Sequence, residues 1–179
     1  MSRRPPPLTE TLCLRCGLCC NGVLFADVEL RSGDDPAALA EAGVPLHYKH
    51  GKIKFPQPCP CLENGHCRIY SQRPVRCRTF DCRLLQRARE GKIALSEARY
   101  IIHTTREQAE RVRRLVRALG QRDETIPLSR RYQAIMRQPM DLSRSEAHLR
   151  RRSDLLLAVY ELTRLLEQHF LGTPQVSDR

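Results

Sequence analysis

Cys13-Leu-Arg-Cys16-Gly-Leu-Cys19-Cys20 is a run of eight residues that carries four of the nine cysteines in this 179-residue chain. The other five follow in one later stretch, as Cys59, Cys61, Cys67, Cys77 and Cys82. Thiolates packed this closely repel one another unless a cation lies between them, as it does in a metal site or an iron–sulfur cluster. The cysteines therefore predict a metal-binding domain.

A disulfide framework is the other common use of many cysteines, and three features of the sequence oppose it. The cysteines are odd in number, the first 25 residues contain no continuous apolar segment for export, and 41% hydrophobic residues can form a core without cross-links. The apolar runs are also too short to cross a bilayer. We therefore expect a cytoplasmic protein with reduced thiols and no membrane span.

The part of the chain after Cys82 has no cysteines and shows a helical pattern. Apolar residues recur at spacings of three and four up to Leu119, which predicts an amphipathic helix that ends near Gly120. A second long helix is predicted to begin at Ser143, with Glu146 completing a capping box, and to stop at Gly172 and Pro174. Residues 127–137 suit a short helix between them.

The first half of the chain is expected to be compact and rich in turns. Residues 23–30 and 53–55 suit strands, and residues 34–43 suit a short helix with an acidic cap and a proline in its first turn. We therefore predict an α+β protein: an irregular cysteine-rich metal-binding domain over residues 1–90, followed by an all-α helical hairpin over residues 91–179. The two long helices should pack antiparallel against each other and against the cysteine domain.

The cysteine pattern resembles a known family. Cys13-x-x-Cys16-Gly-x-Cys19-Cys20, then Cys59-Pro-Cys-Leu62, then the stretch from Gly65 to Phe80 with Arg73-Pro74 and Cys77 are similar to the YkgJ-like CxxCxxCC family of bacterial cysteine-cluster proteins. The resemblance covers about residues 12 to 82. It implies a zinc- or iron-chelating module, often described as an iron–sulfur protein, and a related module occurs in flagellin lysine N-methylases. Cys61 and Cys82 depart from the family pattern.

Eight cysteines are the expected metal ligands: Cys13, Cys16, Cys19, Cys20, Cys59, Cys67, Cys77 and Cys82. One arrangement is a single site that draws ligands from both stretches, and the other is two sites with four ligands each. The adjacent side chains of Cys19 and Cys20 diverge, so one of them should face a second site or stay free. Cys82 is included because a turn after Cys77 can bring it back, whereas the role of Cys61 stays open.

An iron–sulfur cluster is the preferred cofactor and zinc is the alternative. The repeated Cys-x2-Cys-x2-Cys spacing is that of bacterial ferredoxins, and Cys59 is followed by a proline, as the remote fourth ligand often is there. Paired cysteines at short spacing are equally typical of tetrahedral zinc sites.

Two further functions compete with simple metal binding. The net charge of +11 includes arginine clusters at residues 111–114, 130–131 and 150–152, which suit a zinc-stabilised module that binds nucleic acid or a protein through basic helices. A redox accessory or oxidoreductase is the other alternative. The sequence carries no glycine-rich dinucleotide loop, phosphate-binding loop or nucleophile elbow, so it identifies no catalytic residue.

Overall fold

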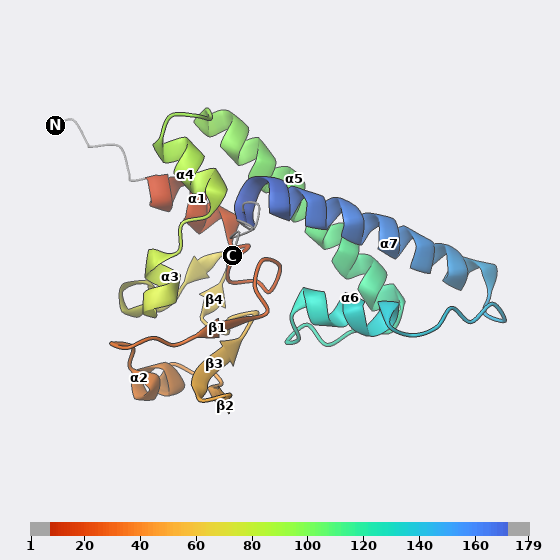
Figure 1. The fold of residues 1–179 in the computed structure, drawn as a ribbon, viewed down its shortest axis with the longest axis horizontal. Coiled ribbons are helices and arrows are strands. Elements are labelled where there is room, and N and C mark those ends of the chain that lie inside the picture. The colour runs from red at the N-terminus through yellow and green to blue at the C-terminus, as the bar shows by residue number, and fades with distance from the viewer. Residues whose placement is uncertain (1–7, 172–179) are drawn as a thin grey trace, which may run out of the picture.

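The computed structural model describes residues 8–171, which combine two small sheets with a helical half (Figure 1). This confirms the predicted α+β class. The first half contains the elements α1 (Leu8–Cys16), β1 (Asp27–Glu29), α2 (Pro36–Glu41), β2 (His47–Lys49), β3 (Lys52–Pro56), β4 (Leu62–Glu63), β5 (His66–Cys67), the 3-10 turn η1 (Tyr70–Gln72), α3 (Val75–Thr79) and α4 (Arg83–Arg89).

The strands form a three-stranded antiparallel sheet in the order β1-β3-β2 and a separate β4-β5 hairpin. The strand predicted at residues 53–55 lies within β3, whereas the one predicted at residues 23–30 is shortened to β1. Val23 and Leu24 are buried in the main core instead, and the Leu24 amide donates to the Leu18 carbonyl at 3.0 Å. The backbone at Leu24 is therefore tied to the cysteine-rich turn, and pairing toward β3 begins at Ala26, whose carbonyl accepts from the Gln57 amide at 3.0 Å.

The predicted short helix at residues 34–43 is confirmed as α2. The Asp35 carboxylate caps it by accepting from the amides of Ala37 at 2.9 Å and Ala38 at 3.1 Å, and Pro36 occupies its first turn. Gly43 follows with a φ of +82°, the left-handed conformation that commonly ends a helix.

The helical half consists of α5 (Leu95–Ala118), α6 (Leu128–Met136) and α7 (Glu146–Leu166), and α7 continues into the π-helical turn η2 (Glu167–Leu171). α5 and α7 pack along each other, and η2 returns to α4, just before the start of α5 (Figure 1). The two long helices are therefore antiparallel, as predicted. α5 ends before Gly120, whose φ is +98°.

The predicted start of the second long helix is wrong by two residues. Ser145 is the N-cap, and its side chain accepts from the His148 amide at 3.4 Å. The Ser143 hydroxyl instead donates to Asp141 Oδ1 at 2.6 Å, and the Ser143 amide donates to the same oxygen. Asp141 thus holds Ser143 in a side-chain turn before the helix. The predicted stop at residues 172 and 174 lies outside the described residues.

Two apolar clusters hold the fold together. The main core joins both halves of the chain, since Leu12 and Leu18 share it with Val112 of α5 and Leu162 of α7. The smaller core lies beside the three-stranded sheet and contains Leu39, Val44, Phe55 and Cys61. Each helix within residues 8–171 is too short or too polar to span a bilayer.

Candidate metal centre

Helix α1 and the turn after it present the first four cysteines. Sequence reasoning did not predict this helix, which places Cys13 and Cys16 one turn apart at its C-terminal end. Gly17 ends it with a φ of +68°, and the amides of Cys20 and Asn21 both donate to the Gly17 carbonyl at 3.0 Å. The tight turn brings Cys19 and Cys20 close to the helix end.

The second stretch of cysteines is joined to this turn by a backbone hydrogen bond of Cys59. The Cys59 amide donates to the Cys20 carbonyl at 2.8 Å, and Cys67 pairs with Leu62 across the β4-β5 hairpin. Cys77 lies in α3, whose Val75 amide donates to Asp34 Oδ1 at 2.7 Å.

Cys82 lies apart from these, at the N-cap of α4. Its sulfur accepts from the Leu85 amide at 3.5 Å. Because α4 packs against α1, Cys82 comes to the side of the turn that carries Cys13 and Cys16.

Four of the thiols form what we call the first cysteine set: Cys13, Cys16, Cys19 and Cys82. Burial is the main cause that raises their pKa values, to about 11 for Cys13 and about 12 for Cys16. A negative charge on Cys82 raises the pKa of each of the other three further. Cys16, Cys19 and Cys82 also pack against the main core.

Four others form the second cysteine set: Cys20, Cys59, Cys67 and Cys77. Burial again is the main cause, and it raises the pKa to about 12 for both Cys59 and Cys77. A negative charge on Cys61 raises the pKa values of Cys59 and Cys67. Charges on Cys20 and Cys67 raise those of Cys59 and Cys77, and Cys67 does the same for Cys20. Cys59 and Cys77 pack against the smaller core.

This grouping assigns Cys19 and Cys20 to different sets. The two sets meet at that point, because a charge on Cys20 raises the pKa values of Cys13 and Cys19. Among the side chains described, those of residues 11–171, no three cysteine, histidine, aspartate or glutamate side chains are already placed to hold one metal ion together. Metal binding by either set therefore requires thiol side chains to rotate and lose their protons.

Arg73 is a functional candidate that the sequence indicated only as part of the family motif. Its charge lowers the pKa values of Cys13, Cys20, Cys67 and Cys77, so its field reaches both sets. The guanidinium carbon lies 3.6 Å from the centre of the Tyr70 ring, and Nε donates to the Tyr70 carbonyl at 2.9 Å. A fixed cation beside several thiolates stabilises their charged form.

Two arginines of α5 hold the cysteine turn from the helical half. Arg106 donates to the Arg15 carbonyl at 2.6 Å and lowers the pKa of Cys16, and Arg113 donates to the Asn21 carbonyl at 3.0 Å. The helical hairpin therefore positions the cysteine turn directly. Sequence reasoning missed these contacts because each joins residues about 90 positions apart.

Cys61 differs from the other eight cysteines because it lies fully inside the smaller core. Its sulfur donates to the Ala42 carbonyl at 3.7 Å, and Arg68 Nη2 lies 3.9 Å from the same sulfur. These contacts suit a thiol that fills the interior.

Gly22→Ala is expected to destabilise the protein and lower its metal content. Gly22 has a φ of +76°, and a Cβ there would meet Pro58 Cδ at 3.1 Å and Pro58 N at 3.2 Å. The cost should be about 1–3 kcal/mol, and it should separate Cys20 from Cys59. Gly33→Ala is the matched control, because Gly33 has a φ of +90° with no atom within 4 Å. Thermal melting and metal analysis compare them; equal effects of the two variants would show that the contact with Pro58 is unimportant.

The fold and the clustered thiols define a cysteine-rich protein of the metal-binding class. Residues 12–113 match the family model CxxCxxCC, described as a "Putative zinc- or iron-chelating domain". This match covers more than half of the chain, so the protein belongs to that family, and metal binding follows for the class as a whole. The match extends past the cysteines into α5, in agreement with the contacts of Arg106 and Arg113. Searches of curated proteins and of solved structures each found no match.

Proposed function

We propose that this protein holds two metal centres, each bound by four cysteine thiolates, and that the first of them is an iron–sulfur cluster. The ligands of the first centre are the first cysteine set, and those of the second are the second cysteine set. Two observations support the proposal. A charge on Cys82 raises the pKa values of the other three thiols of the first set, whereas charges on Cys20 and Cys67 raise those of Cys59 and Cys77. In addition, Cys16, Cys19 and Cys82 pack against the main core, and Cys59 and Cys77 pack against the smaller one.

The chemistry of the donors supports metal binding at both sets. Without a cation, gathering four thiolates is opposed by burial and by mutual repulsion, and both effects are present in each set. A metal ion or cluster removes that repulsion and favours loss of the thiol protons. Arg73 and Arg106 contribute further positive charge around the thiolates.

Spacing supports an iron–sulfur cluster at the first set. In bacterial ferredoxins a Cys-x2-Cys-x2-Cys run ligates one cluster with a remote cysteine, while the next cysteine of the run ligates the other cluster. Here Cys82 takes the place of the remote ligand, and Cys20 turns to the second set. Sequence reasoning favoured Cys59 as the remote ligand. The proposal assigns Cys59 to the second set instead, because its amide donates to the Cys20 carbonyl at 2.8 Å and charges on Cys20 and Cys67 raise its pKa. An iron–sulfur cluster supplies one-electron transfer, and its potential depends on nearby charge and hydrogen bonds.

We place the protein in a bacterial cytoplasm, where reducing conditions keep the thiols available as ligands. Nucleic-acid binding is not part of the proposal, because several arginines of the basic clusters are bonded to other groups of the chain. Arg152 donates to the carbonyls of Ile135, Gln138 and Pro139, and Arg111 pairs with Glu161 at 3.2 Å.

Anaerobic purification followed by visible spectroscopy and analysis of iron, sulfide and zinc tests the cofactor. We expect a broad visible absorption band that bleaches on reduction, with iron and sulfide in the sample. Colourless protein with zinc at both centres would contradict the iron–sulfur assignment.

A further inference from the structure

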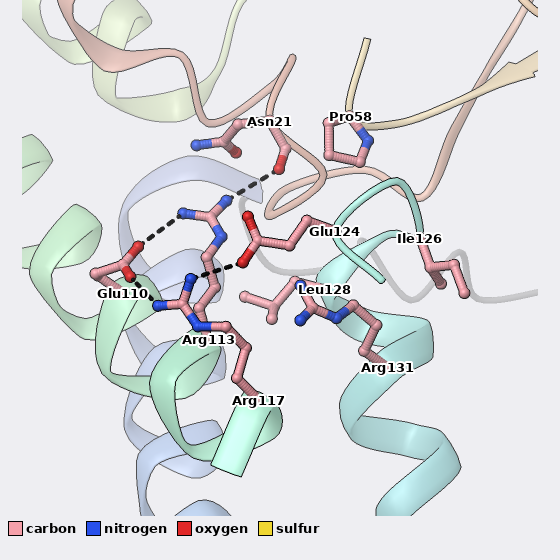
Figure 2. A pocket seen from close by; sticks show the side chains of 9 residues that line it. All are labelled: Asn21, Pro58, Glu110, Arg113, Arg117, Glu124, Ile126, Leu128 and Arg131. Carbon is pink, nitrogen blue, oxygen red and sulfur yellow. Dashed lines mark hydrogen bonds and ion pairs between the residues drawn. The ribbon is translucent and has the colours of Figure 1, made fainter. Parts of the chain in front are cut away.

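A pocket of about 190 Å³ lies between α5, α6 and the loop that joins them, with Asn21 and Pro58 at its edge (Figure 2). Five charged side chains line it: Glu110, Arg113, Arg117, Glu124 and Arg131. Pro58, Ile126 and Leu128 add apolar wall. None of these residues takes part in the proposed metal centres, so the pocket is a separate feature of the molecule.

Arg131 is a buried arginine of this pocket with a hydrogen-bond donor left unpaired by the described residues. This arginine is only 2% exposed, and its Nη2 donates to the Gln121 carbonyl at 2.7 Å. Its Nε is buried and has no hydrogen-bond partner among the described residues. A buried cationic donor without an acceptor is costly, so the site favours an anion that reaches it.

The other two arginines hold carboxylates of the chain itself. Arg117 donates from Nη1 to Glu124 at 2.6 Å and from Nη2 to Glu110 at 2.9 Å (Figure 2). Arg113 lies 3.5 Å from the other oxygen of Glu110 and donates to the Asn21 carbonyl. Glu110 thus joins two arginines of the same helix, whereas Glu124 reaches in from the loop.

Glu124 is therefore the movable anion of this group. Its side chain is 55% exposed, and it has no contact with Arg113 or Arg131 short enough to count as an ion pair within the described residues. When Glu124 swings out, three guanidinium groups face one carboxylate, and the excess of positive charge matches a dianion. Guanidinium forks also suit the geometry of phosphoryl oxygens.

We propose that this pocket binds a phosphoryl dianion, either free phosphate or a small phosphate ester, which displaces Glu124 from Arg117 and accepts hydrogen bonds from Arg117 and Arg131. The apolar wall gives an ester room for a small carbon body. Because Asn21 and Pro58 are the neighbours of Cys20 and Cys59, the bound anion contacts the segment that carries the second cysteine set.

Isothermal titration of the metal-loaded protein tests the site, with inorganic phosphate and phenyl phosphate as the probes in phosphate-free buffer at fixed ionic strength. We expect binding of one anion per chain. Glu124→Gln should strengthen it several-fold because the competing carboxylate is lost, whereas Arg117→Gln and Arg131→Met should each weaken it by about tenfold or more. Tighter binding of phenyl phosphate would identify an ester as the ligand, and tighter binding of inorganic phosphate would identify the free ion.

Arg130→Met is the matched control, since Arg130 lies beside Arg131 in α6 but is not among the residues that line the pocket and pairs with Asp27 at 3.2 Å. It should bind phosphate as the unchanged protein does. The proposal is overturned if neither the unchanged protein nor any variant binds phosphate. It is also overturned if the unchanged protein and all the variants bind phosphate equally. Arg117 is partly exposed, so its variant tests the site even if Arg131→Met fails to fold. Metal content is measured in every sample, which separates failure of this proposal from failure of the metal centres.

Discussion

Replacing Cys82 by serine is expected to remove the metal of the first cysteine set and to leave that of the second. Cys77→Ser should give the reverse result, because Cys77 groups with Cys20 and Cys67. A hydroxyl is a poor substitute for a soft thiolate, so each centre should lose most of its metal. Iron, sulfide and zinc per chain, measured on anaerobically purified variants, give the result directly.

Cys61→Ser is the control for this pair, since its thiol is buried in the smaller core and contacts a backbone carbonyl. We expect both metals to remain, with some loss of thermal stability. Complete loss of all metal in both Cys82→Ser and Cys77→Ser would indicate a single shared centre. Metal loss in Cys61→Ser without loss in Cys82→Ser would instead make Cys59 and Cys61 a chelating pair.

Removal of the metal is expected to unfold the cysteine-rich half and to leave much of the helix content. Binding of a structural metal contributes about 10–16 kcal/mol in zinc-finger peptides, as much as the whole stability of a typical domain, about 5–15 kcal/mol. The smaller core has only four buried hydrophobic residues, whereas α5 and α7 bury long apolar stripes against each other. Near- and far-ultraviolet circular dichroism before and after treatment with a chelator compares the two halves.

Limited proteolysis of the same samples tests the proposed division into residues 1–90 and 91–179. Cleavage should begin in the first segment once metal is removed. A metal-free protein that keeps its near-ultraviolet signal and its resistance to protease would contradict the expectation that metal supplies folding energy to this half. Simultaneous loss of all structure would show that the main core, which joins the two halves, makes them one folding unit.

The parts of the fold that depend on local patterns were predictable. The apolar stripe of α5, its end before Gly120 and the Asp35 cap of α2 each follow from residues close together in the sequence. The cap of α7 was assigned to Ser143 because two serines precede the helix and only Ser143 matches the capping-box spacing. Asp141 engages that serine first, a competition that the spacing rule does not include.

The candidate site was predictable only in its composition. The spacing of Cys13, Cys16 and Cys19 indicates that they bind one metal centre. The position of Cys82 beside them depends on the packing of α4 against α1. The same limit applies to Arg131, whose burial results from contacts among α6, α5 and the loop between them. Long-range packing of this kind leaves no periodic signal in a single sequence.

Native mass spectrometry of the anaerobically purified protein tests the central claim most directly, because it counts the metal centres on each intact chain. We expect a mass above that of the bare chain that corresponds to two centres, at least one of them an iron–sulfur cluster. Cys82→Ser and Cys77→Ser should each retain one of them. A single added mass in the unchanged protein, lost entirely in both variants, would show one shared centre in place of two.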